Sequence, residues 1–324
     1  MFPLTDASDQ GARLISGLIK IASSEGRGLD TMRMTQYMAG ILVETALLFD
    51  KPDEALNGSL QALSVELDAD PVLGELGAYA LPPAHVIDLE TERGREAARD
   101  LFEECLECEY AFHELIIGIV STVITSWENV GQGRAETLRL VIECAFRAMA
   151  FEISAQELCD IMIDVKIAKH EWTINDCVAG LSAMSGLRLG LSTSAEFCMM
   201  FSGSDLPGHL DDLSCVMTAE AVRLGVPAGS DWRFGLPAND VPPSPPHDLI
   251  EGVDHICSDF FEAINLQCAY DQAVATAKAA GRMLAVAAGG KCPEIEPVIA
   301  KPLAMSAISE SYKSVCMDLA AVSY

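Results

Sequence analysis

The sequence predicts an all-α fold, either a multi-helix bundle or stacked helical hairpins. Apolar residues recur at intervals of three and four along most of the 324 residues, which is the spacing of one helix face. No proline lies between Pro83 and Pro207, and a proline costs about 3 kcal/mol in a helix interior. Half of the residues are hydrophobic, so the chain can bury a large core.

Three helices are expected in the N-terminal part of the chain. The first follows the apolar stripe from Leu14 to Ile21, and the second runs from Met34 to Leu48 after Asp30 as an N-cap. Pro52 disfavours helical geometry in the residue before it, so the second helix should end near Asp50. A third helix is expected from Asp53 to Leu67.

The proline-free segment predicts four further helices. A break at Gly131–Gly133 and a capping pattern at Ser154 and Glu157 separate them. The expected ranges are Glu92–Trp127, Ala135–Phe151, Ala155–Trp172 and Asn175–Met184.

The C-terminal third admits two interpretations. A helix stripe runs from Leu249 to Ile264, whereas Leu187–Ser194 and Met283–Ala288 are compatible with strands. If Met283–Ala288 is instead helical, the helix should end at the cap signal Gly289–Gly290. We prefer all-α over the mixed α/β alternative for this part of the chain.

Prolines and glycines divide the chain into three parts. The expected organisation is a mainly helical body over residues 1–234, a proline-rich linker or loop at 235–246, and a C-terminal helical segment at 247–324. We expect the last segment to pack on the same core as the body.

Charge and cysteine content limit the cellular compartment and the binding partners that we expect for this protein. With 21 basic and 48 acidic residues the net charge is −27, which disfavours binding to nucleic acids and anionic membranes. The uncharged stretch Leu115–Trp127 is shorter than the roughly 20 residues of a membrane-spanning helix. No secretory signal is visible, and single cysteines in apolar patterns are typical of reduced thiols. These features predict a cytoplasmic protein, and the apolar excess predicts a homo-oligomer.

One segment concentrates side chains that bind transition metals. On one continuous helix, Cys105, Glu109 and His113 would share a face, with Cys108 beside them. Thiolate, carboxylate and imidazole groups are ligands of zinc and iron, so these four residues form a candidate metal site. The two cysteines also follow an apolar stripe, with Glu109 and His113 at its edge, which is compatible with both cysteines being core residues.

Three functions remain open from the sequence. The preferred one is a helical enzyme or cofactor-binding protein with zinc or iron, whose candidate catalytic residues are Glu109, His113, His170 and Glu171. One alternative is an interaction scaffold that docks a basic partner on the acidic segment Asp88–Glu109, which holds nine acids and three arginines. Another is a binder of an apolar small molecule in a methionine-lined cavity.

Overall fold

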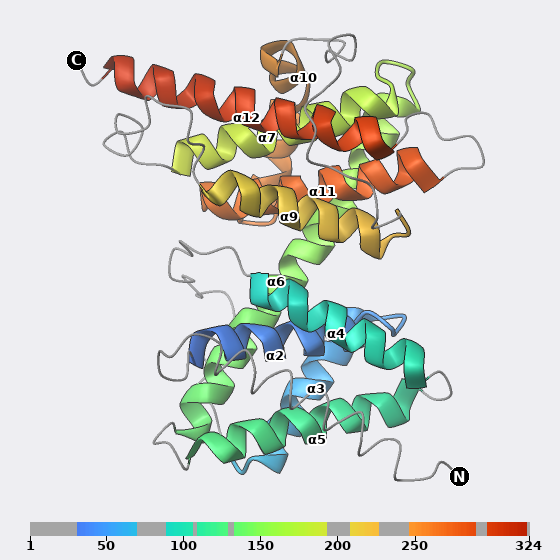
Figure 1. Ribbon diagram of the computed structural model, residues 1–324, viewed down its shortest axis with the longest axis vertical. Coiled ribbons are helices and arrows are strands. Elements are labelled where there is room, and N and C mark those ends of the chain that lie inside the picture. Colours follow the sequence, from blue (N-terminus) through green and yellow to red (C-terminus); the bar gives the residue numbers. More distant parts are fainter. Residues whose placement is uncertain are drawn as a thin grey trace. The chain divides into compact units, whose positions relative to one another are not determined.

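The structure is a computed structural model that describes residues 31–69, 89–105, 109–128, 133–192, 208–226, 246–289 and 297–322. Every regular element in these ranges is helical, which confirms the predicted all-α class (Figure 1). Within the same ranges, no helix combines the length and apolarity needed to cross a membrane. The chain divides into two compact units, one formed chiefly by residues up to 150 and the other by residues from 151 onward.

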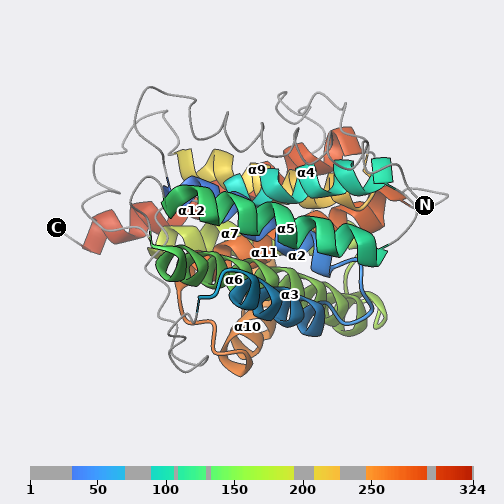
Figure 2. The ribbon, with the colours of Figure 1, turned by 90° about the horizontal axis from the view of Figure 1, so that it is seen from below.

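The described residues of the first unit form four helices and the first part of a fifth. These are α2 (Thr31–Ala46), α3 (Pro52–Glu66), α4 (Leu89–Cys105), α5 (Glu109–Glu128) and the residues of α6 (Arg134–Met162) up to Ala150. Helices α3 and α5 contact each other and α2, and they lie in the foreground of Figure 2. The apolar faces of α2, α3, α5 and α6 enclose one core, which includes Met38, Ile41, Leu42, Leu56, Leu63, Ile116, Ile124 and Leu138.

Helix α4 lies unusually close to α2 because both carry a glycine at the contact. A Cβ atom on Gly40 would overlap the backbone carbonyl of Thr91, and a Cβ on Gly94 would overlap that of Tyr37. The Thr91 hydroxyl also donates a hydrogen bond of 3.2 Å to the carbonyl oxygen of Gln36. The two backbones therefore touch directly, as in other helix pairs that meet through small residues.

The single helix predicted over Glu92–Trp127 is wrong, because the structure divides it into α4 and α5. The rings of Phe102 and Phe112 meet edge to face with their centroids 5.3 Å apart. Ten residues along one helix would separate them by about 15 Å, so the chain must turn back. In Figure 1 the two helices accordingly run in different directions from their shared end.

The second unit is organised around α7 (Ile174–Ser192). This helix packs against α10 (Pro246–Ala263), α11 (Ala269–Gly289) and α12 (Pro297–Val322), and α11 also packs against α9 (Gly208–Arg223) (Figure 1). All residues from Cys177 to Gly186 are buried, so α7 is surrounded rather than amphipathic. Close approach again depends on glycine, since a Cβ on Gly186 would overlap the carbonyl of Ile308 on α12.

The boundary predicted at Ser154 is also wrong. Helix α6 continues through it to Met162 and is followed by a π-helical segment, η1 (Ile163–Ile167). Ser154 is buried inside the helix, so the Ser–Glu spacing there is not a cap. The true cap of this type begins α7, where Thr173 and Asp176 exchange hydrogen bonds between side chain and backbone.

The strands considered in the C-terminal third are absent from the described residues. Leu187–Ser192 forms the last turns of α7, and Met283–Ala288 lies within α11. Both stretches belong to helices that are buried on several sides, which weakens the periodicity that distinguishes helix from strand.

The division into units differs in position from the one drawn on the sequence. The units separate near residue 150, within α6, whereas the sequence-based boundary follows residue 234. The proline-rich segment 235–246 lies outside the described residues except for Pro246, which begins α10. Helices α10, α11 and α12 all contact α7. The expected first helix, Leu14–Ile21, also lies outside the described residues.

The contact between α2 and α4 predicts opposite effects of alanine at two glycines of the first unit. Gly40→Ala should lower the free energy of unfolding by about 1–3 kcal/mol because the methyl group forces the backbones apart. Gly58→Ala should raise it by about 0.5–1 kcal/mol, since Gly58 is exposed within α3 and its Cβ would meet nothing within 4 Å. Urea denaturation of both variants measures this, and equal effects would contradict the direct backbone contact.

Candidate functional site

His113 lies in the first turns of α5 and faces α3. Its Nε2 is 2.6 Å from the Ser59 hydroxyl, and its ring meets the edge of Phe49 with the centroids 5.7 Å apart. Burial lowers the pKa of His113 below its usual 6.5, opposed by the charge of Glu114. The imidazole is therefore mainly neutral at pH 7 and is held by a serine 54 positions earlier in the sequence.

The other three proposed metal ligands are placed only in part. Cys105 is the last residue of α4 and Glu109 the first of α5, while Cys108 and the side chains of Cys105 and Glu109 lie outside the described part of the chain. Because the chain turns between the two helices, spacing alone no longer puts Cys105 on the face of His113. Among the described residues, no group of three or more His, Cys, Asp and Glu side chains is arranged to hold a metal ion. The four-residue metal site stays a prediction.

His170 and Glu171 belong to the second unit, whereas His113 belongs to the first. His170 has a positive φ of 59° and ends the helical segment, with its N–H donating to the carbonyl of Ile167. Glu171 accepts a hydrogen bond of 3.2 Å from Lys166, whose ammonium group also lies over the ring of Trp172. Both residues are exposed and take part in ending η1.

The acidic segment Asp88–Glu109 coincides largely with α4. Two of its three arginines face α2, where Arg95 and Arg99 each place Nε 2.9 Å from a carboxylate oxygen of Glu44. Arg95 is fully buried, and Glu44 is 5% exposed. On the solvent side, Glu96 is exposed. The pairing with Glu44 directs two positive charges away from the surface, and docking of a basic partner stays a prediction.

A second network of buried charges joins α6, α9 and α11. Glu152 on α6 is 2% exposed and Glu220 on α9 is fully buried. Arg282 on α11 pairs with both carboxylates: its Nη2 contacts Glu152, and its Nε is 2.9 Å from Glu220 Oε1. Arg223 Nη2 is 2.6 Å from each of the same two carboxylates, and Lys278 Nζ is 3.4 Å from Glu152. Five charged side chains thus hold three helices together.

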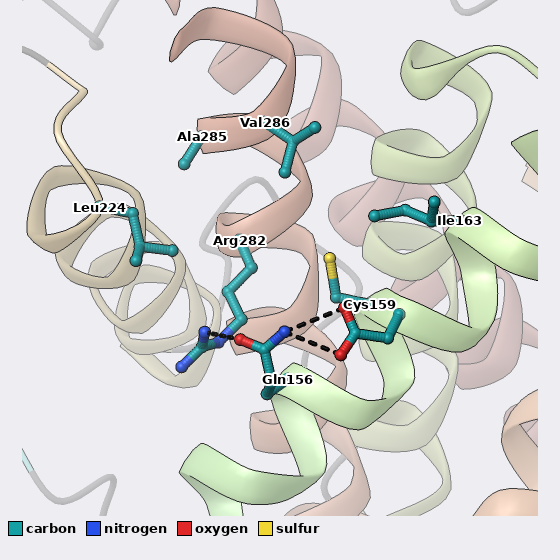
Figure 3. A pocket seen from close by; sticks show the side chains of 8 residues that line it. Gln156, Cys159, Ile163, Leu224, Arg282, Ala285 and Val286 are labelled. Carbon is teal, nitrogen blue, oxygen red and sulfur yellow. Dashed lines mark hydrogen bonds between the residues drawn. The ribbon is translucent and has the colours of Figure 1, made fainter. Parts of the chain in front are cut away.

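A pocket of about 520 Å³ opens beside this network (Figure 3). Polar groups of Gln156, Asp160 and Arg282 line one part of it. The remaining lining is Cys159, Ile163, Leu224, Ala285 and Val286. Ile163 is the first residue of η1, and π-helical turns are often found at functional sites.

The polar part of the pocket is a chain of hydrogen bonds. Arg282 Nη1 donates to the amide oxygen of Gln156, and the Gln156 amide nitrogen donates to both Asp160 oxygens at 3.0 and 2.9 Å. Figure 3 shows the Arg282 side chain extending from α11 toward Gln156 on α6. Gln156 and Asp160 are exposed, whereas Arg282 is 8% exposed. The arginine therefore lies on the boundary between the buried network and the open pocket.

Cys159 does not supply a reactive thiolate to this pocket. Burial, with a smaller contribution from Asp160, raises the pKa of the thiol to about 11, although Arg282 lowers it. A thiol with this pKa stays protonated at neutral pH, and the thiolate is the nucleophilic form. The lining of the pocket is suited to recognition by charge and apolar contact rather than to nucleophilic attack by sulfur.

Comparisons with known proteins find no match for this chain among family models, curated proteins or solved structures.

The sequence interpretation missed the residues of this network, although one signal was present. Lys278 and Arg282 are the only charged residues between Ala273 and Gly289, and they lie four apart. Two basic residues on one face of an otherwise uncharged apolar helix indicate a buried pairing. Their partners lie 126 and 62 positions away, at Glu152 and Glu220, and periodicity cannot identify them.

The network predicts a large loss of stability when one carboxylate is removed. Glu152→Gln should lower the free energy of unfolding by about 3–5 kcal/mol because buried cations lose their counter-charge. Glu157→Gln, an exposed position on the same helix, should change it by less than about 0.5 kcal/mol. Chemical denaturation compares the two variants, and similar stabilities would contradict the role of Glu152.

Burial of His113 predicts that acid weakens the first unit. The unfolded histidine takes up a proton near pH 6.5 and the folded one only at lower pH, so stability should fall as the pH drops below 6.5. The slope from this residue is at most about 1.4 kcal/mol per pH unit. Denaturation of the His113→Gln variant at pH 7.5 and 5.5 should show a smaller difference than the unmodified protein. His247→Gln, at an exposed position, is the control, and an unchanged slope in His113→Gln would contradict the prediction.

Proposed function

We propose that this protein binds a small polar molecule in the pocket lined by residues of α6, η1 and α11 and by Leu224, which follows the end of α9. The observation that carries the proposal is the position of Arg282. Its guanidinium group is fixed by Glu152 and Glu220, and Nη1 is directed to a neutral, exposed amide at the pocket.

Because Arg282 is already held in place, binding a ligand costs less side-chain entropy. A flexible surface arginine loses side-chain entropy when it binds a ligand, whereas Arg282 is already ordered by two buried carboxylates. Hydrogen bonds between a guanidinium group and an oxyanion are among the strongest that side chains form. A ligand oxygen would need to replace only the Gln156 amide oxygen.

Exposed apolar residues at the same pocket support binding of a ligand with an apolar part. Leu224 is 40% exposed and Val286 47% exposed, and both line the pocket. Large apolar side chains that converge on a pocket are typical of binding sites. The volume of about 520 Å³ is within the common range for small-molecule sites.

The combined polar and apolar lining favours a small-molecule-binding protein over the two alternatives drawn from the sequence. A purely apolar ligand would leave Arg282, Gln156 and Asp160 without a use in binding. The scaffold hypothesis concerns α4, in the other unit, and is independent of this pocket.

Filling the pocket should abolish binding. We expect ligand-observed NMR with a panel of small carboxylates, phosphates, amines and amino acids to detect at least one class that binds the unmodified protein. Val286→Trp should prevent this binding because the larger side chain occupies the pocket, and its exposed position allows the substitution without repacking the core. Val65→Trp, at a residue 82% exposed on α3, is the matched control and should bind normally.

Two outcomes would contradict the proposal. One is that no class in the panel binds the unmodified protein. The other is that Val286→Trp binds as well as Val65→Trp, which would place the ligand elsewhere.

A further inference from the structure

The Gln156 amide connects a cation to an anion across the pocket. Its oxygen accepts a hydrogen bond from Arg282, and its nitrogen donates to both oxygens of Asp160. The polar part of this pocket therefore combines a donor, Arg282, with an acceptor, Asp160, and the Gln156 amide satisfies both.

We infer that the ligand is a zwitterion of the α-amino-acid type with an apolar side chain, which displaces the Gln156 amide. Its carboxylate would accept from Arg282 and its ammonium group would donate to Asp160. This inference rests on the proposed function, because it names the ligand of the same pocket.

The spacing of the two charges is suitable for such a ligand. In the Gln156 amide the nitrogen and oxygen are separated by two bonds, and in an α-amino acid the ammonium nitrogen and a carboxylate oxygen are separated by three. Asp160 is an exposed side chain near the end of α6, so a change of its rotamer accommodates the additional bond. The ligand groups also carry full charges, and charge-assisted hydrogen bonds are stronger than those of a neutral amide.

The surrounding charges favour a zwitterion over a simple ion. An anion at Arg282 without an ammonium group would lie close to the carboxylate of Asp160, with Glu152 and Glu220 behind the arginine. A cation at Asp160 without a carboxylate would face Arg282. A zwitterion satisfies both groups and brings no net charge into the site.

The rest of the pocket determines the side chain of the ligand. Ile163 on η1, Leu224 after the end of α9, and Ala285 and Val286 on α11 line it. Apolar contact with them favours an aliphatic side chain such as that of leucine, because each buried methylene group adds to the binding free energy.

Leucine and two analogues separate the contributions of its charges. The first analogue, 4-methylpentanoate, lacks the ammonium group, and the second, 3-methylbutylamine, lacks the carboxylate. Isothermal titration calorimetry on the full chain should show leucine binding at least tenfold more tightly than either analogue, because each analogue loses one charge-assisted contact.

A variant of Asp160 tests which residue holds the ammonium group. Asp160→Asn should weaken leucine binding at least tenfold and leave the affinity for 4-methylpentanoate unchanged or higher. Asp164→Asn, at an exposed position on η1, is the matched control and should bind leucine normally. Far-ultraviolet circular dichroism of both variants verifies that the helices remain folded.

The outcomes distinguish this inference from the proposed function. If either analogue binds as tightly as leucine and Val286→Trp removes that binding, the zwitterion inference is overturned while the pocket remains a ligand site. An equal effect of Asp160→Asn and Asp164→Asn on leucine also overturns the inference. If nothing in the broader panel binds, the proposed function and this inference fail together.

Discussion

The carboxylates of Glu152 and Glu220 are removed from water, and they require cations close by. In the second unit this requirement determines how α6, α9 and α11 meet. Helix α11 has buried alanines on several sides, among them Ala273, Ala275, Ala277 and Ala280, so apolar contact alone does not select one rotation about its axis. Lys278 and Arg282 lie four residues apart on one face, and turning that face away from α6 would leave buried charges unpaired. The ion pairs thus provide a specificity that the small apolar side chains lack.

In the first unit, buried ion pairs act together with glycines to hold α2 against α4. Glu44 on α2 is paired with Arg95 and Arg99 on α4, and glycines at the same interface bring the two backbones into contact. Helix α4 is rich in charged residues and buries little apolar surface for its length. Direct backbone contact gives dispersion energy that large side chains would otherwise provide, while the ion pairs fix the register between the helices.

Periodicity predicted the fold where helices have one apolar face and clear boundaries. The expected ranges Met34–Leu48 and Asp53–Leu67 agree closely with α2 and α3, since Pro52 separates them. It failed where no proline or glycine marks a turn, as between α4 and α5, and where a capping pattern occurs inside a helix, as at Ser154. Between α4 and α5 the folded chain brings the rings of Phe102 and Phe112 together, and local periodicity does not register such a contact.

The candidate site was harder to predict than the fold, for a physical reason. Pattern analysis assigns polar and charged residues to the solvent side, and for Gln156 and Asp160 that assignment is correct. It is wrong for Glu152, one turn earlier on the same helix, because its cations come from helices that follow much later in the chain. Similarly, His113 stood out in the sequence, but its hydrogen-bond partner Ser59 did not.

Arg282 links the stability of the second unit to recognition at the pocket. Nη2 contacts Glu152 and Nε lies 2.9 Å from a Glu220 oxygen, whereas Nη1 donates to the Gln156 amide, which is exposed and held in turn by Asp160. The hydrogen bond from Arg282 to the exposed Gln156 amide adds little to stability, because water can replace the amide. Removing Arg282 would disturb both roles at once, because two carboxylates would lose a cation and the pocket would lose its donor. Asp160 and Val286 are exposed residues of the pocket that take no part in the ion-pair network. Substitutions at these two positions therefore change the pocket without removing any of the buried charges, and they separate ligand binding from stability.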